Sequence, residues 1–158
     1  MTNETLSPEE IARYQRHLLL PELGGHGQQL LKAARVMVIG AGGLGAPVLQ
    51  YLAAAGVGTL GIVDDDGVSL SNLQRQVIHD TGTIGELKTI SAERAIVRLN
   101  PHCRIRRYEE RFDAGFADTH LKSFDLLIDG SDNFATRYAA ANAAERGERP
   151  LVTGAVGR

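Results

Sequence analysis

The segment RVMVIGAGGLGAPVLQYLAAAG, residues 35–56, constrains the fold of this chain more than any other stretch. It opens with a continuous apolar run, typical of a strand buried on both faces, and its second half predicts a helix. Gly40, Gly42 and Gly45 lie between them in the pattern G-x-G-x-x-G. The first glycine allows a tight turn, the second lets backbone approach a phosphate, and the third lets helix and strand pack closely. We therefore expect helix amides that face an anion, the alternative being a tight turn without a ligand.

Strands and helices are predicted to alternate along the rest of the chain. Apolar or half-apolar strands are expected at residues 35–40, 58–64, 103–110, 124–130 and 149–155. Helices are expected at residues 44–56, 85–100, 116–123 and 133–148, with a short helical turn at 69–76. This alternation predicts an α/β fold, a Rossmann-like, mainly parallel sheet with helices on both faces.

A helical arm is predicted to precede this sheet. A helix over residues 6–20 begins with Ser7 as the N-cap, and Glu10 completes a capping box. Residues 22–27 are expected to form a loop, and residues 28–34 a short second helix. We interpret residues 1–158 as one domain, with the arm at 1–34 and a Rossmann-like core at 35–158 that is incomplete at its C-terminal end.

Composition excludes several classes of function. A formal net charge of −2 gives no electrostatic reason to expect nucleic acid, and no apolar run reaches the ~20 residues of a membrane span. The polar N-terminus does not resemble a targeting peptide, so we expect a cytoplasmic protein. Cys103 is the sole cysteine, which rules out a disulfide within the chain, and we interpret it as a buried structural residue.

An acidic cluster follows the second predicted strand. Asp64 lies at the strand end, where an acid accepts hydrogen bonds from ribose hydroxyls and disfavours a 2′-phosphate. Asp65 and Asp66 follow, and at least one of the three acids is expected to lie in a solvated turn. NAD and ATP satisfy these features equally well, because both offer a ribose and phosphates.

Charged residues further along the chain favour a triphosphate. Arg75 and Lys88 are cations suited to phosphate oxygens, although each is also compatible with an ordinary surface position. Asp132 and Asn133 begin the helix after the fourth strand, where Asp132 could hold magnesium or serve as an N-cap. A nicotinamide enzyme would also need a hydride site, and no constellation of His, Tyr or Lys suggests one.

Five motifs together resemble a known family: RYQRH, GAGGLG, DDDGVSLSNLQRQ, IGELK and IDGSDN. They are similar to those of the MoeB/ThiF/HesA family of ATP-dependent enzymes that activate ubiquitin-like sulfur carriers, with the molybdopterin-synthase adenylyltransferases most similar. The resemblance extends from about Arg13 to Arg158 and implies that a carrier protein ending in Gly-Gly is adenylated at its C-terminal carboxylate. It also implies a homodimer, and magnesium bound with the ATP.

The resemblance further implies roles for individual residues. Asp64 would hold the ribose, and Asp132 would bind magnesium. Arg16 matches an arginine that reaches across the dimer to the partner's ATP, although His17 stands where the family pattern has glutamine. Arg16, Arg75, Lys88 and Asp132 form the implied catalytic set. The implied nucleotide-binding set comprises Gly40, Gly42, Gly43, Gly45, Asp64, Asp66, Ser71, Asn72, Leu73, Gln74, Arg75, Lys88, Asp132 and Asn133.

Family members are typically longer than this chain. By resemblance, a full-length enzyme adds an antiparallel half-sheet, a loop that clamps the carrier tail and two CxxC pairs that bind structural zinc, and those zinc ligands are absent here. The alternatives to an adenylyltransferase are therefore a non-catalytic nucleotide-binding module and an inactive fragment of such an enzyme.

Overall fold

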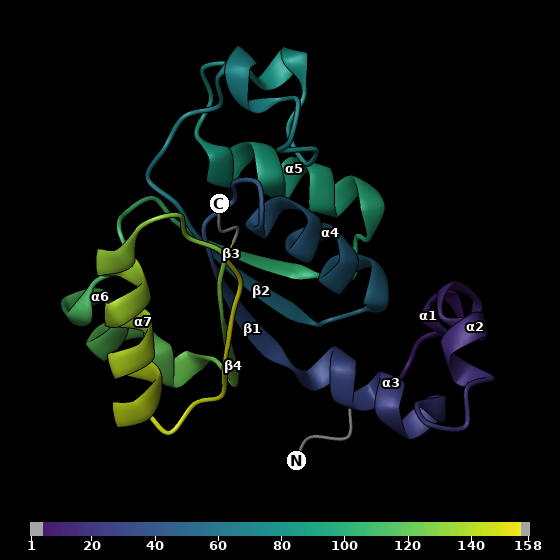
Figure 1. Cartoon of the computed structure of the whole chain (residues 1–158). Coiled ribbons are helices and arrows are strands. Elements are labelled where there is room, and N and C mark those ends of the chain that lie inside the picture. The colour runs from purple at the N-terminus through teal and green to yellow at the C-terminus, as the bar shows by residue number, and fades with distance from the viewer. Residues whose placement is uncertain (1–4, 156–158) are drawn as a thin grey trace.

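A five-stranded parallel sheet forms the centre of the protein, as seen in a computed structural model that describes residues 5–155 (Figure 1). The strand order is β3-β2-β1-β4-β5, and every neighbouring pair runs parallel. The strands are β1 (Arg35–Ile39), β2 (Thr59–Val63), β3 (Arg104–Tyr108), β4 (Leu126–Asp129) and β5 (Leu151–Thr153). The predicted Rossmann-like sheet is therefore confirmed.

Helices cover both faces of this sheet (Figure 1). On one face, α4 (Gly45–Ala55) and α5 (Lys88–Leu99) pack on alternate strand residues, Val36 and Val38 among them. On the other face, α6 (Ala114–His120) and α7 (Phe134–Arg146) share a core with Met37. Because successive side chains of a strand point to opposite faces, the continuous apolar run of β1 is what a sheet covered on both sides requires.

The N-terminal arm is helical, but its boundaries differ from those predicted. The capping box of Ser7 and Glu10 is present and begins α1 (Pro8–Arg13), which ends at Tyr14 before α2 (Gln15–Leu18). The third helix, α3 (Gly24–Ala33), starts inside the predicted loop at residues 22–27. The Leu23 side chain covers Gly27 there, and burial of Gln28 holds the helix in place despite its glycines.

The arm packs where the strands begin, which we call the amino edge of the sheet. The Tyr14 ring lies against Gly56, at the end of α4, and its hydroxyl accepts a hydrogen bond from Asn100 Nδ2 at 2.8 Å. The same Asn100 nitrogen donates to the Ala53 carbonyl, while Gln28 donates to Ala55. These contacts fix α1 and α2 at the amino edge, on the right in Figure 1.

The opposite, carboxyl edge is where a ligand is expected. The chain leaves β1 towards β2 on one side and later returns to β4 on the other, so the carboxyl ends of β1 and β4 flank the point where the strand order reverses. Open α/β sheets bind ligands in the crevice at this point. The segment between β2 and α5, including η1 (Leu70–Asn72) and η2 (Thr81–Thr83), folds over this edge (Figure 1). Among the residues described, no helix combines the length and apolarity needed to cross a membrane.

Candidate functional site

The glycine loop connects β1 to α4 at the carboxyl edge. Gly40 has φ +89°, a left-handed conformation that favours glycine, and a Cβ there would lie 3.1 Å from the Gly130 carbonyl oxygen. A Cβ at Gly45 would overlap the Gly40 carbonyl oxygen, so the third glycine is required for close packing. Cβ atoms at Gly42 and Gly43 would meet nothing closer than 3.5 Å. These two glycines are therefore not required by packing.

The N-terminus of α4 has no side-chain cap. Its N-cap position is Leu44, whereas α1 is capped by Ser7 and α7 by Asn133. Within residues 5–155, the backbone N–H groups of Gly42, Gly43, Leu44 and Gly45 make no hydrogen bond. Unpaired amides at a helix start, together with the helix dipole, form an anion-binding site.

Asp64 closes the glycine loop from β2. Its Oδ2 accepts from the Ala41 N–H at 2.8 Å, and its Oδ1 accepts from the Asp66 N–H at 2.9 Å. Burial raises the pKa of Asp64, which the two backbone hydrogen bonds and the charge of Lys88 oppose. Each carboxylate oxygen keeps a second lone pair that can accept a hydrogen bond from a hydroxyl.

The other two acids of the cluster pair with cations. Asp65 accepts from Arg111 Nε at 2.8 Å, and both side chains are solvated. Asp66 accepts from Lys88 Nζ at 2.8 Å. The three carboxylates lie close enough to share an ion, but their partners already explain their positions. Asp65 and Asp66 are both exposed, so the prediction that at least one of the three acids is solvated is confirmed.

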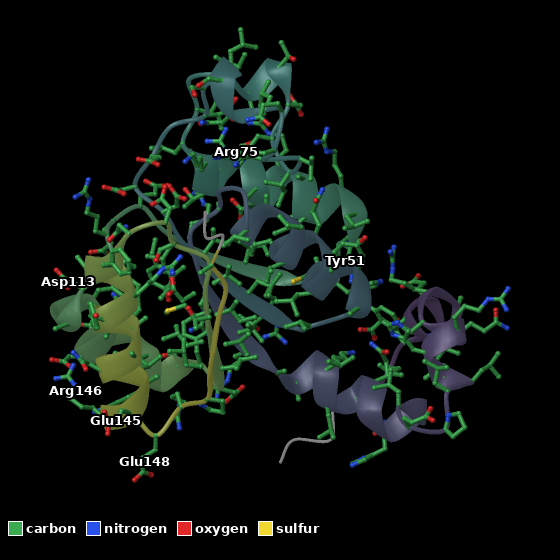
Figure 2. All side chains as sticks on the ribbon, in the orientation of Figure 1. Tyr51, Arg75, Asp113, Glu145, Arg146 and Glu148 are labelled. Carbon is green, nitrogen blue, oxygen red and sulfur yellow. The ribbon has the colours of Figure 1, made fainter. Side chains whose placement is uncertain are left out.

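Lys88 and Arg75 supply positive charge at this edge. Lys88 is the first residue of α5 and its side chain is only 7% exposed, which excludes the ordinary surface position. Arg75 is exposed and its stem lies beside Gly43, where a Cβ would be 3.7 Å from Arg75 Cδ. Its Nη1 donates to the Ser71 carbonyl at 3.2 Å, and Figure 2 shows it above the loop at the carboxyl edge.

The start of α7 separates the roles of two polar neighbours. Asn133 is the N-cap and accepts from the Thr136 N–H at 2.9 Å, so the possibility that Asp132 is the cap is wrong. Asp132 is exposed and makes no hydrogen bond or ion pair with any residue between 5 and 155. Its carboxylate is therefore available to a ligand.

The remaining residues of the implied nucleotide-binding set lie in and after η1. The Asn72 carbonyl accepts from the N–H groups of Arg75 and Gln76, which folds the segment into a turn. Asn72 and Leu73 are half-buried, while Ser71 and Gln74 are exposed. This segment and the glycine loop meet where the Arg75 stem lies beside Gly43.

Arg16 is not part of this arrangement. It lies exposed on α2, within the arm that packs at the amino edge. The structure therefore does not bring Arg16 together with the glycine loop of its own chain.

Three buried polar residues at the carboxyl edge escaped the sequence analysis. Gln76 Oε1, Thr89 Oγ1 and Ser131 Oγ are buried without a hydrogen-bond partner among the described residues. His79 is also buried, and it donates to the glycine loop. None of them belongs to a periodic pattern. Ser131 carried the signal of a polar residue just after a strand, and Thr89 that of one at a helix start, whereas Gln76 and His79 lie in an irregular segment that gives no such signal.

Cys103 lies outside the site, at the amino edge. It is buried in the core beside β3, and burial raises the pKa of its thiol to about 12. A thiol with such a pKa is protonated near neutral pH and is a poor nucleophile. This agrees with the structural interpretation of Cys103.

The fold and this edge define a Rossmann-type domain whose glycine loop opens onto the carboxyl edge of the sheet. The family model of ThiF matches residues 14–158, and the chain belongs to the ThiF family. Over 153 residues it is 56% identical to the probable adenylyltransferase/sulfurtransferase MoeZ of Mycobacterium tuberculosis. The aligned residues cover 97% of this chain and 39% of MoeZ. It is 49% identical over 148 residues to the sulfur carrier protein adenylyltransferase of Thermus thermophilus, covering 94% of this chain and 55% of that protein.

Solved structures give the same fold. The Escherichia coli tRNA N6-threonylcarbamoyladenosine dehydratase TcdA, solved in complex with ATP, superposes with a TM-score of 0.91 at 26% identity. The superposition covers 98% of this chain and 64% of TcdA. TcdA has also been solved in complex with AMP. The chain thus spans less than two thirds of each of these proteins, and its activity is a matter for proposal.

Proposed function

We propose that the carboxyl edge binds ATP and that this domain supplies the nucleotide site for adenylation of a ubiquitin-like sulfur-carrier protein. The main support is the open N-terminus of α4, where four amides have no partner among the described residues and Gly43 lies beside the Arg75 stem. Lys88 and Asp64 complete a site with cations for phosphates and an acceptor for ribose hydroxyls. The names of the relatives support the choice of reaction.

The proposed chemistry needs no general base. A C-terminal carboxylate of the carrier, ending in Gly-Gly, attacks the α-phosphate of ATP, forming an acyl-adenylate and releasing pyrophosphate. A carboxylate is already a nucleophile, so catalysis consists of positioning and of stabilising charge on the phosphates. In this proposal Gly42 and Gly43 present amides to phosphate oxygens, while Arg75 and Lys88 stabilise the charge that develops on the leaving pyrophosphate.

Asp132 is proposed to hold magnesium. Its exposed carboxylate has no partner among the described residues, and carboxylate oxygens are the ligands that Mg²⁺ prefers. When bound, magnesium would neutralise phosphate charge at this site. Asn133 would contribute the N–H donors of its side-chain amide, because its Oδ1 already accepts from the Thr136 N–H at the start of α7.

Arg16 is proposed to act on the site of a second copy of the chain. Its place at the amino edge supports a role in a homodimer, where the arm of one protomer would reach the nucleotide of its partner. The proposal requires only that the arm remain attached to its own sheet, as the Tyr14 and Gln28 contacts indicate.

Carrier-dependent exchange of pyrophosphate into ATP tests this function. We expect exchange to require magnesium and to fall strongly in Arg75→Ala, Lys88→Ala and Asp132→Ala, each costing on the order of 2–4 kcal/mol in the barrier. Mixing inactive Arg16→Ala with inactive Asp132→Ala should restore about a quarter of the wild-type activity. About half of the randomly formed dimers contain one copy of each variant, and each of these has one intact site out of two.

Matched variants away from the site serve as controls. Arg98→Ala removes an exposed arginine of α5, and Asp118→Ala removes an exposed carboxylate of α6, so both should exchange normally. Exchange that survives all three site substitutions would refute the proposed function. ATP binding without any exchange, in the presence of the carrier, would favour a non-catalytic nucleotide-binding module.

A further inference from the structure

His79 contacts the glycine loop from the interior of the protein. It is 5% exposed, and its Nε2 lies 2.9 Å from the Ala41 carbonyl oxygen, while its Nδ1 lies 2.8 Å from Ser91 Oγ. A carbonyl oxygen can only accept, so Nε2 carries a proton and donates to it. Burial lowers the pKa of His79, which favours the neutral ring and leaves Nδ1 as an acceptor for the Ser91 hydroxyl.

The ring is held by a buried polar network. Ser91 lies on α5, and its hydroxyl is 3.0 Å from that of Thr83; because the Ser91 proton goes to Nδ1, the Thr83 hydroxyl donates to Ser91 Oγ and accepts from the Asp80 N–H. Ser91 and Thr83 are both buried. A histidine fixed at one nitrogen in this way has a set tautomer and a set orientation at the other nitrogen.

Ala41 is therefore held on both sides. Its N–H donates to Asp64, and its carbonyl accepts from His79. In a trans peptide the N–H points opposite to the preceding carbonyl, so a carbonyl fixed on His79 directs the Gly42 N–H away from the core. That N–H is one of the four loop amides that make no hydrogen bond within residues 5–155.

We propose that His79 is a positioning residue that fixes the Ala41–Gly42 peptide so that the Gly42 N–H faces a nucleotide phosphate. The proposal rests on the proposed nucleotide site, and His79 itself does not contact the nucleotide. Gln76 is a second buried polar residue of the same segment that lies against the glycine loop. It is 5% exposed, and its Nε2 would lie 3.5 Å from a Cβ at Gly42. An amide aligned before binding costs no reorganisation when the phosphate arrives.

Two substitutions separate positioning from packing. Gln places its amide nitrogen near the position of the imidazole Nε2, so His79→Gln keeps a donor for the Ala41 carbonyl. Asn reaches only the position of Nδ1, so His79→Asn keeps a partner for Ser91 and loses the loop contact. His26→Gln replaces an exposed histidine of α3 and serves as the control.

ATP affinity, measured by calorimetry with magnesium, is the first readout. We expect the affinity of His79→Asn to fall about tenfold, the fold-change that corresponds to one misplaced hydrogen bond to a charged group. His79→Gln should lie within about threefold of the wild type, and His26→Gln should match it. Unfolding temperatures identify any variant whose fold is lost.

The amide resonance of Gly42 in the ligand-free chain is the second readout, and it does not depend on ATP. We expect its shift to move in His79→Asn and to remain in His79→Gln. An unmoved Gly42 resonance in His79→Asn, or equal loss of ATP affinity in the Gln and Asn variants, overturns the role of His79. If the wild type binds no ATP while the resonance behaves as expected, the proposed nucleotide site fails and the positioning of the peptide stands.

Discussion

The two edges of the sheet differ in how far their buried polar groups are paired. At the amino edge, the arm satisfies them: Tyr14, Gln28 and Asn100 all have hydrogen-bond partners, and Glu10 pairs with Lys32 at 2.7 Å. At the carboxyl edge, polar groups are buried or aligned without partners. Among the described residues they include the amides of the α4 start and the side-chain oxygens of Gln76, Thr89 and Ser131, whereas the amino edge holds one such group, Arg149 Nε, just before β5.

Unpaired polar groups reduce stability, so their concentration at one edge requires a reason. Leaving a buried donor or acceptor unsatisfied costs roughly 1–3 kcal/mol, whereas a satisfied one contributes to folding. A ligand that supplies the missing partners recovers this cost on binding. We infer that the amino edge is organised for stability and the carboxyl edge for binding.

The largest expected effects come from glycines that both edges require for packing. Gly45→Ala would drive a methyl group into the Gly40 carbonyl oxygen, and Gly58→Ala into the Lys32 carbonyl oxygen. Backbone cannot yield as a side chain does, so we expect each variant to lose more than about 3 kcal/mol of unfolding free energy or to be insoluble. Urea unfolding measures this.

Gly42→Ala is the matched test of the carboxyl edge. A Cβ there meets only the Gln76 side chain at 3.5 Å, so the fold and its stability should survive. The proposed phosphate contact needs close approach to the Gly42 N–H, so a methyl group on the same residue should lower ATP affinity. Normal ATP binding by folded Gly42→Ala would contradict the division between the two edges.

Asn100→Ala tests the amino edge with a smaller effect. The substitution removes hydrogen bonds to Tyr14, Ala53 and His102, and it leaves the buried Tyr14 hydroxyl without a partner among the described residues, while the Ala53 carbonyl keeps the bond from the Gly56 N–H. We expect a loss of roughly 2–4 kcal/mol in the free energy of unfolding. ATP affinity measured well below the unfolding transition should not change.

The reverse pattern is expected at the carboxyl edge, where Lys88→Ala should weaken ATP binding far more than it weakens the fold. Asn142→Ala, an exposed asparagine on α7, is the control and should stay within about 0.5 kcal/mol of the wild type. If Asn100→Ala and Lys88→Ala changed stability and affinity in the same proportion, the two edges would not be functionally distinct.

The sheet could be predicted from the sequence because its determinants are local. β1 carries an apolar run that only a doubly covered strand needs, and Gly56 ends α4 in the left-handed conformation expected of a helix C-cap. The arm was predicted less well. The glycines of residues 24–27 favour a loop by propensity, and tertiary packing of Leu23 and Gln28 overrides that preference.

The candidate site divides in the same manner. Residues at strand ends and helix starts, such as Asp64 and Lys88, could be placed at one edge because parallel strands share their carboxyl ends. His79 and Gln76 lie in an irregular segment without periodicity, so only the three-dimensional structure reveals that both reach the glycine loop. That the Asp132 carboxylate is not the cap of α7 likewise depends on one backbone turn.

The smallest expected effect concerns pH and stability. Burial lowers the pKa of His79 below its ordinary value of 6.5, and the charges that face it are those of Lys88, Asp64 and Asp80. As the pH falls below about 6.5, the unfolded chain takes up a proton at this position that the folded chain resists, so folding loses stability. The contribution is fully present above that pH.

His79→Gln removes this titration and keeps the hydrogen bond to Ala41. Unfolding free energies of the wild type and of His79→Gln should therefore differ by a constant above about pH 7 and converge, or cross, in the acid range. The four other histidines are common to both proteins and cancel in the difference. A difference that stays constant from pH 8 to pH 5 would show that His79 is not held neutral by burial.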